Sequence, residues 1–150
     1  MEPDELLRRY NAGERDFRKA VLAVPGRVLA RILDGAKLMG IDLSEADLFG
    51  LGLMGVNLTS ANLHKANLAY ARMFAAELRD ANLSDADLAL ADVQAADLRG
   101  ANLRGANLTE AALSGADLRG ADLTGAKVLG ADFEGAMLSG AVMPDGTIHA

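Results

Sequence analysis

A five-residue period runs through most of this chain. Twenty-two consecutive pentads extend from Ala36 to Asp145 without a slip, most of them reading Ala, Asp or Asn, Leu, a variable residue and then often Gly. The third residue of each pentad is its centre, and 17 of the 22 centres are Leu. Ala stands two residues before the centre in 19 pentads. The fold must therefore place residues five positions apart in equivalent environments.

This period excludes the two simplest regular structures. Five residues turn an α-helix by about 500°, so successive Leu side chains would be scattered around its axis. A flat β-strand alternates its side chains with a period of two, so successive centres would point to opposite faces. Neither structure buries the leucines together.

Extended pentads joined by corners do satisfy the pattern. The centre and the Ala two residues before it share one face of an extended segment, while the residues on either side of the centre face outward. Gly at the fifth position suits a corner. If the chain bends in the same sense after every pentad, all centres converge on one axis, and the coils form a β-solenoid.

The tandem motif A(D/N)LxG, read from Ala36 onward, resembles the pentapeptide repeat family. The resemblance implies an all-β fold, a right-handed quadrilateral parallel β-helix with four pentads per coil. Each residue then lies about 4.8 Å from the residue 20 positions later. The expected structural core includes these stacked residues: Leu48, Leu68, Leu88, Leu108, Ala66, Ala86 and Ala106.

A 20-residue coil also aligns charged side chains into a ladder. The predicted ladder comprises Glu77, Arg79, Asp97, Arg99, Asp117 and Arg119. On other sides, Asn alternates with Asp in the same column, which relieves repulsion between stacked carboxylates. A 15-residue coil would place Arg79 over Gln94 and lose the charge ladder, so the sequence favours four sides.

The ends of the chain depart from the repeat, and four regions are expected. Residues 1–16 form an N-terminal helical cap, with a short helix over 3–12 that covers the first coil. Residues 17–35 form a degenerate first coil, in which Pro25–Gly35 is either a short helical insertion or a bulged coil. Residues 36–145 form the β-helix and 146–150 a C-terminal tail.

Composition and motifs exclude several functions. The net charge of −6 argues against nucleic-acid binding, and there is no Cys for a disulfide or thiolate metal site. No run is long and apolar enough to span a membrane, and no secretory signal is visible, so a cytoplasmic location is expected. No nucleotide-binding, hydrolase or zinc motif occurs, and His64 and His149 are expected to face solvent. We expect no catalytic residue, no metal and no cofactor.

Large apolar residues at outward or corner positions are the main functional indication. The candidate interaction patch comprises Met39, Phe49, Met54, Tyr70, Phe74, Leu90 and Leu129. Exposed apolar clusters often mark interaction surfaces. The sequence therefore predicts a non-catalytic interaction or structural scaffold that contacts an unidentified protein or a second copy of itself. The alternative, which rests on the family resemblance, is a DNA-mimic inhibitor of an enzyme such as DNA gyrase.

Overall fold

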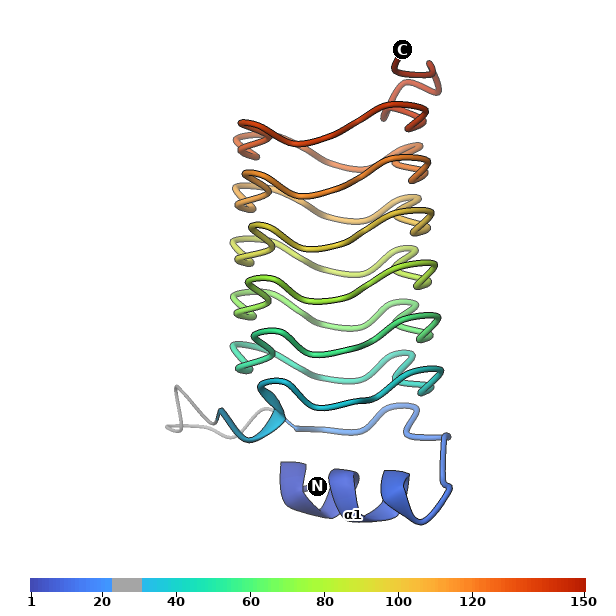
Figure 1. The fold of residues 1–150 in the computed structure, drawn as a ribbon, viewed down its shortest axis with the longest axis vertical. Helices are drawn as coiled ribbons and strands as arrows, with labels where there is room; N and C mark the ends of the chain where they lie inside the picture. The colour runs from blue at the N-terminus through green and yellow to red at the C-terminus, as the bar shows by residue number, and fades with distance from the viewer. Residues whose placement is uncertain (23–30) are drawn as a thin grey trace.

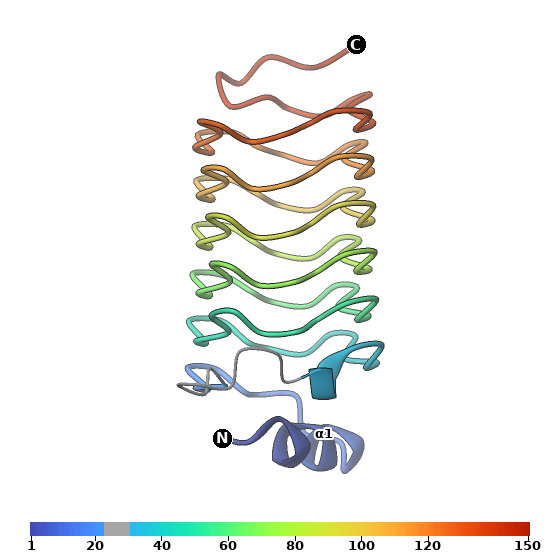
Figure 2. The ribbon, with the colours of Figure 1, turned by 90° about the vertical axis from the view of Figure 1, so that its left-hand side faces the viewer.

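The computed structural model describes residues 1–22 and 31–150. Its named helices are α1 (Pro3–Asn11) and the 3₁₀ helix η1 (Arg31–Leu33). From Ala36 onward the chain winds into a stack of similar coils, with α1 below the first coil and the C-terminus above the last (Figures 1 and 2). We number the full coils 1 to 5, beginning at residues 36, 56, 76, 96 and 116, and a half coil follows.

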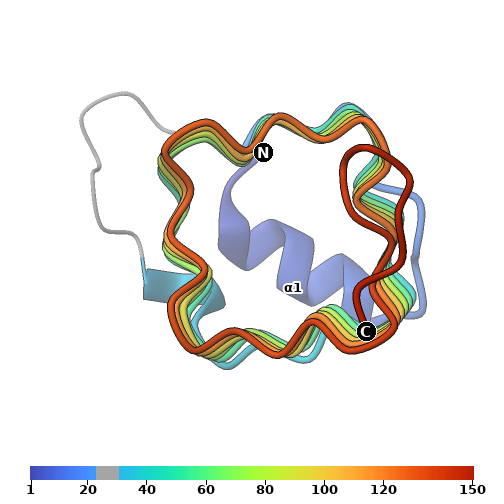
Figure 3. The same ribbon diagram turned by 90° about the horizontal axis from the view of Figure 1, so that it is seen from above.

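Successive coils pair in parallel with a register of 20 residues. Asp47 bridges Asn67, which bridges Asp87, and the same spacing holds on every side. In each pair the centre donates its N–H to the next coil, as Leu48 does to the carbonyl of Asn67 at 2.8 Å. Seen along the axis, the coils superimpose as a rectangle (Figure 3). The predicted four-sided parallel β-helix is therefore confirmed.

The centres define four sides. Side I carries Leu38, Leu58, Leu78, Leu98, Leu118 and Leu138. Side II carries Leu43, Leu63, Leu83, Leu103, Leu123 and Met143. Side III carries Leu48, Leu68, Leu88, Leu108 and Val128, and side IV carries Leu53, Met73, Val93, Leu113 and Phe133. On each side, the residue before the centre occupies the first outward position, the residue after it the second, and the fifth residue the corner.

The corners bend because their fifth residue adopts a positive φ. Gly supplies this conformation at many corners, such as Gly100 at +66°. Elsewhere a residue with a side chain adopts it, as do Tyr70 at +60° and Leu90 at +57°. Each corner closes with a turn hydrogen bond, such as that from the N–H of Ala71 to the carbonyl of Leu68 at 3.0 Å.

The core is a continuous column of Leu and Ala along the axis. Leu68 and Ala66 are fully buried, and the other residues expected in the core are at most 1% exposed. Burying a Leu side chain stabilises a fold by about 1.5–3 kcal/mol before conformational entropy is counted. The long apolar column therefore holds the coils together.

Helix α1 closes the N-terminal end of this column. It crosses beneath the first coil (Figure 3), burying Leu6 completely and Tyr10 almost completely. The Tyr10 hydroxyl donates to the carbonyl of Met39 at 2.8 Å. The helix ends in a Schellman motif, in which Glu14 N–H bonds the Arg9 carbonyl and Gly13, at φ +100°, bonds the Tyr10 carbonyl.

The first turn of the solenoid is out of register with the rest. Asp16 bridges Asp42 and Val21 bridges Asp47, a spacing of 26 residues that exceeds one coil by six. The extra residues fall between Leu22 and Leu33, both of which are buried. Of the interruption expected at 25–35, residues 31–33 form η1, and 25–30 lie outside the described residues.

The C-terminal end is less covered than the N-terminal end. The chain turns at Gly146, and Ile148 bridges Val142 in antiparallel fashion, so the last residues fold back on the half coil. The centres Val128 and Phe133 are only partly buried, because no further coil packs above them. Neither described helix has the length and apolarity needed to cross a membrane.

Candidate functional site: the outer surface of the solenoid

Asp and Asn recur at the first outward position because they complete the backbone hydrogen bonding. Their side-chain oxygen accepts the N–H of the residue two positions later, as Asp87 does from Ala89 at 3.0 Å and Asn62 from His64 at 3.2 Å. That N–H points away from the neighbouring coil and has no backbone partner. These residues therefore form an Asx turn at each such pentad, which is a structural task.

Asn adds a second bond that Asp cannot make. Asn67 donates its amide to the carboxylate of Asp47 one coil below at 3.1 Å, and Asn107 donates to Asp87 at the same distance. On side II, Asn62, Asn82 and Asn102 each donate to the coil below. The alternation expected from the sequence thus corresponds to directional side-chain ladders.

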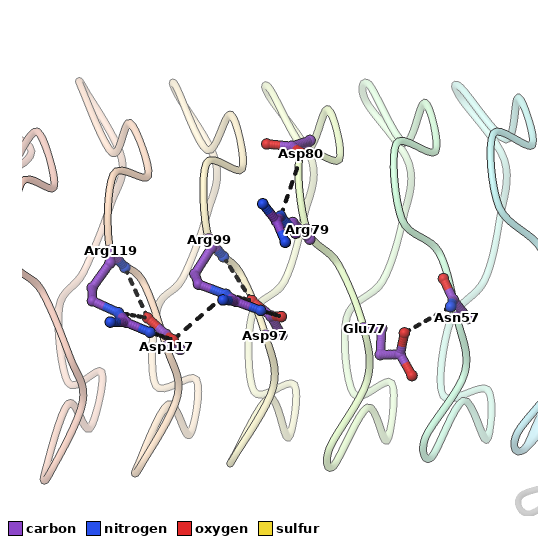
Figure 4. A network of polar contacts seen from close by, with 8 residues as sticks. All are labelled: Asn57, Glu77, Arg79, Asp80, Asp97, Arg99, Asp117 and Arg119. Carbon is purple, nitrogen blue, oxygen red and sulfur yellow. Dashed lines mark hydrogen bonds and ion pairs between the residues drawn. The ribbon is translucent and has the colours of Figure 1, made fainter.

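The charge ladder on side I forms over its upper half (Figure 4). Arg99 binds the Asp97 carboxylate through Nε at 2.8 Å and also lies 3.6 Å from Asp117. Arg119 binds Asp117 through Nε at 2.9 Å. These paired guanidinium groups lower the pKa values of Asp97 and Asp117, chiefly through their side-chain hydrogen bonds.

The lower half of this column is arranged differently. Glu77 accepts a hydrogen bond from Asn57 at 2.7 Å, and Arg79 lies 3.7 Å from Asp80 (Figure 4). Glu77 and Arg79 therefore make no ion pair with each other in the part of the chain that the structure describes. Arg99 and Arg119 each come two residues after an Asp and are followed by Gly. Arg79 comes two residues after a Glu and precedes Asp80, which offers a nearer partner.

The described residues contain no group of three or more His, Asp or Glu arranged to hold a metal ion. His64 is half-buried, and its Nδ1 lies 2.8 Å from the Ser84 hydroxyl and 3.0 Å from the Ser84 carbonyl. The Ser84 hydroxyl in turn donates to Asn82 at 2.7 Å. These contacts tie the ring to the neighbouring coil rather than aligning it for proton transfer.

Five members of the candidate patch lie on sides III and IV: Phe49, Tyr70 and Leu90 at the corner where these sides meet, and Met54 and Phe74 at the opposite end of side IV. We call Phe49, Met54, Tyr70, Phe74 and Leu90 the corner cluster. The rings of Phe49 and Tyr70 are in contact, with centroids 5.4 Å apart. Tyr70 is 53% exposed and Phe74 44% exposed. The cluster is therefore an apolar surface that solvent reaches.

The other two members of the patch lie elsewhere. Met39 occupies the second outward position of side I, where its carbonyl receives the Tyr10 hydroxyl. Leu129 lies on side III but in coil 5, far from Phe49 in coil 1, and it is 80% exposed. The sequence predicted the side on which each residue lies but not the distances between the side chains.

Sequence reasoning did not single out two charged residues of side III. Lys127 is exposed and Asp47 half-buried, and neither forms an ion pair within residues 1–22 and 31–150. Both occupy the first outward column, Lys127 at its upper end and Asp47 in coil 1, above Val21. Their column positions followed from the period of 20, but an unpaired charge is visible only once neighbouring side chains are placed.

Comparison with protein families identifies the class. A model described as pentapeptide repeats matches eight copies in three overlapping segments, residues 53–88, 86–125 and 116–145. These segments cover well over half of the chain, so the chain belongs to the pentapeptide repeat family. No curated protein matches it significantly.

Solved structures agree with this class. The chain is similar to Rfr23, a pentapeptide repeat protein from the cyanobacterium Cyanothece 51142, with 27% identity, coverage of 89% of this chain and 93% of that one, and a TM-score of 0.56. HetL, a pentapeptide repeat protein involved in heterocyst differentiation regulation in Nostoc sp. strain PCC 7120, is 27% identical over 99% and 100%, with a TM-score of 0.34. QnrB1, a plasmid-mediated fluoroquinolone resistance protein, is 24% identical over 83% and 72%, with a TM-score of 0.38. With the four-sided coils described above, the likeness to Rfr23 identifies the chain as a right-handed quadrilateral β-helix.

Proposed function

We propose that this protein is a non-catalytic scaffold that binds a protein partner through the corner cluster. The observation that carries the proposal is the contact of Phe49 with Tyr70, beside the exposed Leu90, at the corner where sides III and IV meet. Clustered aromatic side chains of this kind form the centres of protein interfaces.

The rigid backbone supports this role. Inter-coil and turn hydrogen bonds join the coils on every side of coils 1 to 4, so the cluster is held on a fixed frame. A preorganised surface loses little conformational entropy on binding.

Other functions receive less support. The family is one of structural and interaction proteins rather than enzymes. A DNA mimic requires an extended negative surface, but Arg99 and Arg119 neutralise Asp97 and Asp117 along side I. A cytoplasmic location remains part of the proposal, and fractionation of the native host tests it.

The test of the scaffold role is affinity capture from the native host with Phe74→Asp. The matched control is Gln94→Asp, which places the same charge in the same column one coil higher. We expect the wild type and the control to retain one specific protein that the Phe74 variant loses. Retention of that protein by folded Phe74→Asp would exclude the side IV members of the corner cluster, Met54 and Phe74, as the contact surface.

A further inference from the structure

The outer columns of side III are self-complementary when one copy is inverted against another. From coil 1 to coil 5, the first outward column reads Asp47, Asn67, Asp87, Asn107 and Lys127. The second outward column reads Phe49, Ala69, Ala89, Thr109 and Leu129, and the corner column Gly50, Tyr70, Leu90, Glu110 and Gly130. We infer that side III packs against side III of a second copy of this chain, with the two solenoids antiparallel. This inference rests on the proposed interaction role of the surface.

The symmetry of this arrangement follows from the shape of the side. The coils superimpose with little twist, so side III is flat (Figure 3). A two-fold axis lying in the interface along residues 86–90 inverts the order of the coils but leaves each column facing the same column. Such an interface is isologous, so it closes as a dimer and does not propagate.

The apolar residues pair under this operation. Phe49 in coil 1 faces Leu129 in coil 5 of the second copy, and this contact occurs twice. Leu90 lies on the axis and faces itself, and Ala89 beside it leaves room for close approach. These three large side chains are 49%, 80% and 44% exposed in the single chain, and the dimer covers all of them. The arrangement gives Leu129, which lies outside the corner cluster, an apolar partner.

The charged and polar residues pair as well. Asp47 faces Lys127 of the second copy, which pairs two opposite charges that have no ion pair within the described chain. Tyr70 faces Glu110 of the second copy, so its hydroxyl gains a carboxylate acceptor. That hydroxyl makes no hydrogen bond to any described residue of its own chain. Each pairing occurs twice because of the symmetry.

One contact opposes the dimer, and it provides a sharp test. Asp87 lies near the axis and faces Asp87 of the second copy, which places two like charges together. Asp87→Asn removes this repulsion and keeps the oxygen that accepts the N–H of Ala89. The substitution should therefore strengthen the dimer without disturbing the fold.

The same operation on side IV gives no complementary match. Inverted about coil 3, Phe74 would face Ser114 and Met54 would face Glu134, so its apolar residues meet polar ones. Side II carries no large apolar residue at its second outward position, which reads Ser44, His64, Ser84, Arg104, Thr124 and Pro144. Side I carries Met39 beside α1 and then mainly charged residues.

The size of side III predicts a weak dimer. Five coils at a spacing of about 4.8 Å are roughly 24 Å tall. A single side of this height buries less than the roughly 800 Å² per partner of a standard interface. We therefore expect a dissociation constant in the micromolar range.

Site-specific cross-linking tests the contact. Because the chain has no native cysteine, only the introduced thiols can react. Leu90→Cys places one thiol on each copy beside the axis, and Gln94→Cys places one on side IV of the same coil. A short bis-maleimide matches facing sheets about 10 Å apart. We expect covalent dimer from the Leu90 variant of the full chain at tens of micromolar, and at least tenfold less from the Gln94 variant. Equal yields from the two variants would overturn the inference.

Sedimentation velocity on two charge variants gives independent evidence. Lys127→Glu should raise the dissociation constant about tenfold by placing Glu opposite Asp47, and Asp87→Asn should lower it. A wild type that stays monomeric at several hundred micromolar, or charge variants that leave the dimer unchanged, would refute the pairing. Phe74 lies on side IV, outside the proposed dimer contact. A protein that is monomeric but still captures a partner through Phe74 would refute the dimer and leave the scaffold role standing, so the two failures are distinguishable.

Discussion

At the scale of single residues, most identities are explained by the backbone around them. Leu88 and Ala86 were expected in the core from their spacing alone, and both are 1% exposed. The Asx role of Asp and Asn was missed, because the sequence shows that these residues face outward but not which N–H they meet. The position of Arg79 was also missed, since its choice of Asp80 over Glu77 depends on side-chain reach.

Ala112 offers a test of the Asx role. It occupies the first outward position of side IV, where Asn would accept the N–H of Ser114 and donate to Asp92 one coil below. We expect Ala112→Asn to raise the free energy of unfolding by about 0.5–1.5 kcal/mol, measured by urea denaturation. Ala112→Gln is the control, because its longer side chain cannot form the same turn. Equal stability of the two variants would contradict the role.

At the scale of elements, α1 and the corners follow from local chemistry. Pro3 at the start and Gly13 beyond the end predicted a helix over 3–12, and α1 spans Pro3–Asn11. Gly at the fifth position predicted a corner, and positive φ values occur there. Nothing local predicted that Tyr70 and Leu90 would adopt the same conformation, because the stacked coils above and below impose it on them.

Two glycines with the same backbone conformation allow the cost of a positive φ to be separated from the cost of a steric clash. Gly100 and Gly115 have φ values of +66° and +67°, but a Cβ would clash with the Asp80 carboxylate only at Gly100. We expect Gly115→Ala to cost about 1–2 kcal/mol of unfolding free energy, and Gly100→Ala to cost slightly more because the exposed Asp80 side chain must move aside, by thermal denaturation. Adding Asp80→Ala to Gly100→Ala should return the cost to that of Gly115→Ala. A double variant as unstable as the single one would show that the carboxylate is irrelevant.

At the scale of the whole molecule, the period of five residues determines which side chains are buried, and the period of 20 determines which surface residues stack on one another. The period of five was readable directly and predicted the core. The four-sided coil came from the family resemblance and from the alignment of Arg99 with Arg119, since five-residue units alone do not fix the number of sides. The contact of Phe49 with Tyr70 required the structure, because it depends on how the two side chains lie beside the corner.

The uneven ends of the solenoid predict uneven stability. Leu88 in coil 3 is fully enclosed, whereas Leu138 in the half coil is only partly buried. We expect Leu88→Ala to lower the global free energy of unfolding by about 2–5 kcal/mol, and Leu138→Ala by much less. Hydrogen exchange should show that Leu138→Ala accelerates exchange only near the C-terminus. A uniform acceleration in both variants would indicate a single cooperative unit.

The corners also determine how such a chain tolerates changes in length. Adding or deleting one pentad keeps every Leu on the axis, but it rotates everything that follows by a quarter turn. A pentad inserted after Gly105 would leave the interior intact and carry Leu129 from side III to side IV. Only changes of 20 residues preserve both the interior and the relative orientation of surface features. A lineage of such proteins could therefore redirect its contacts by gaining or losing a single pentad, without altering any residue in the contacts themselves.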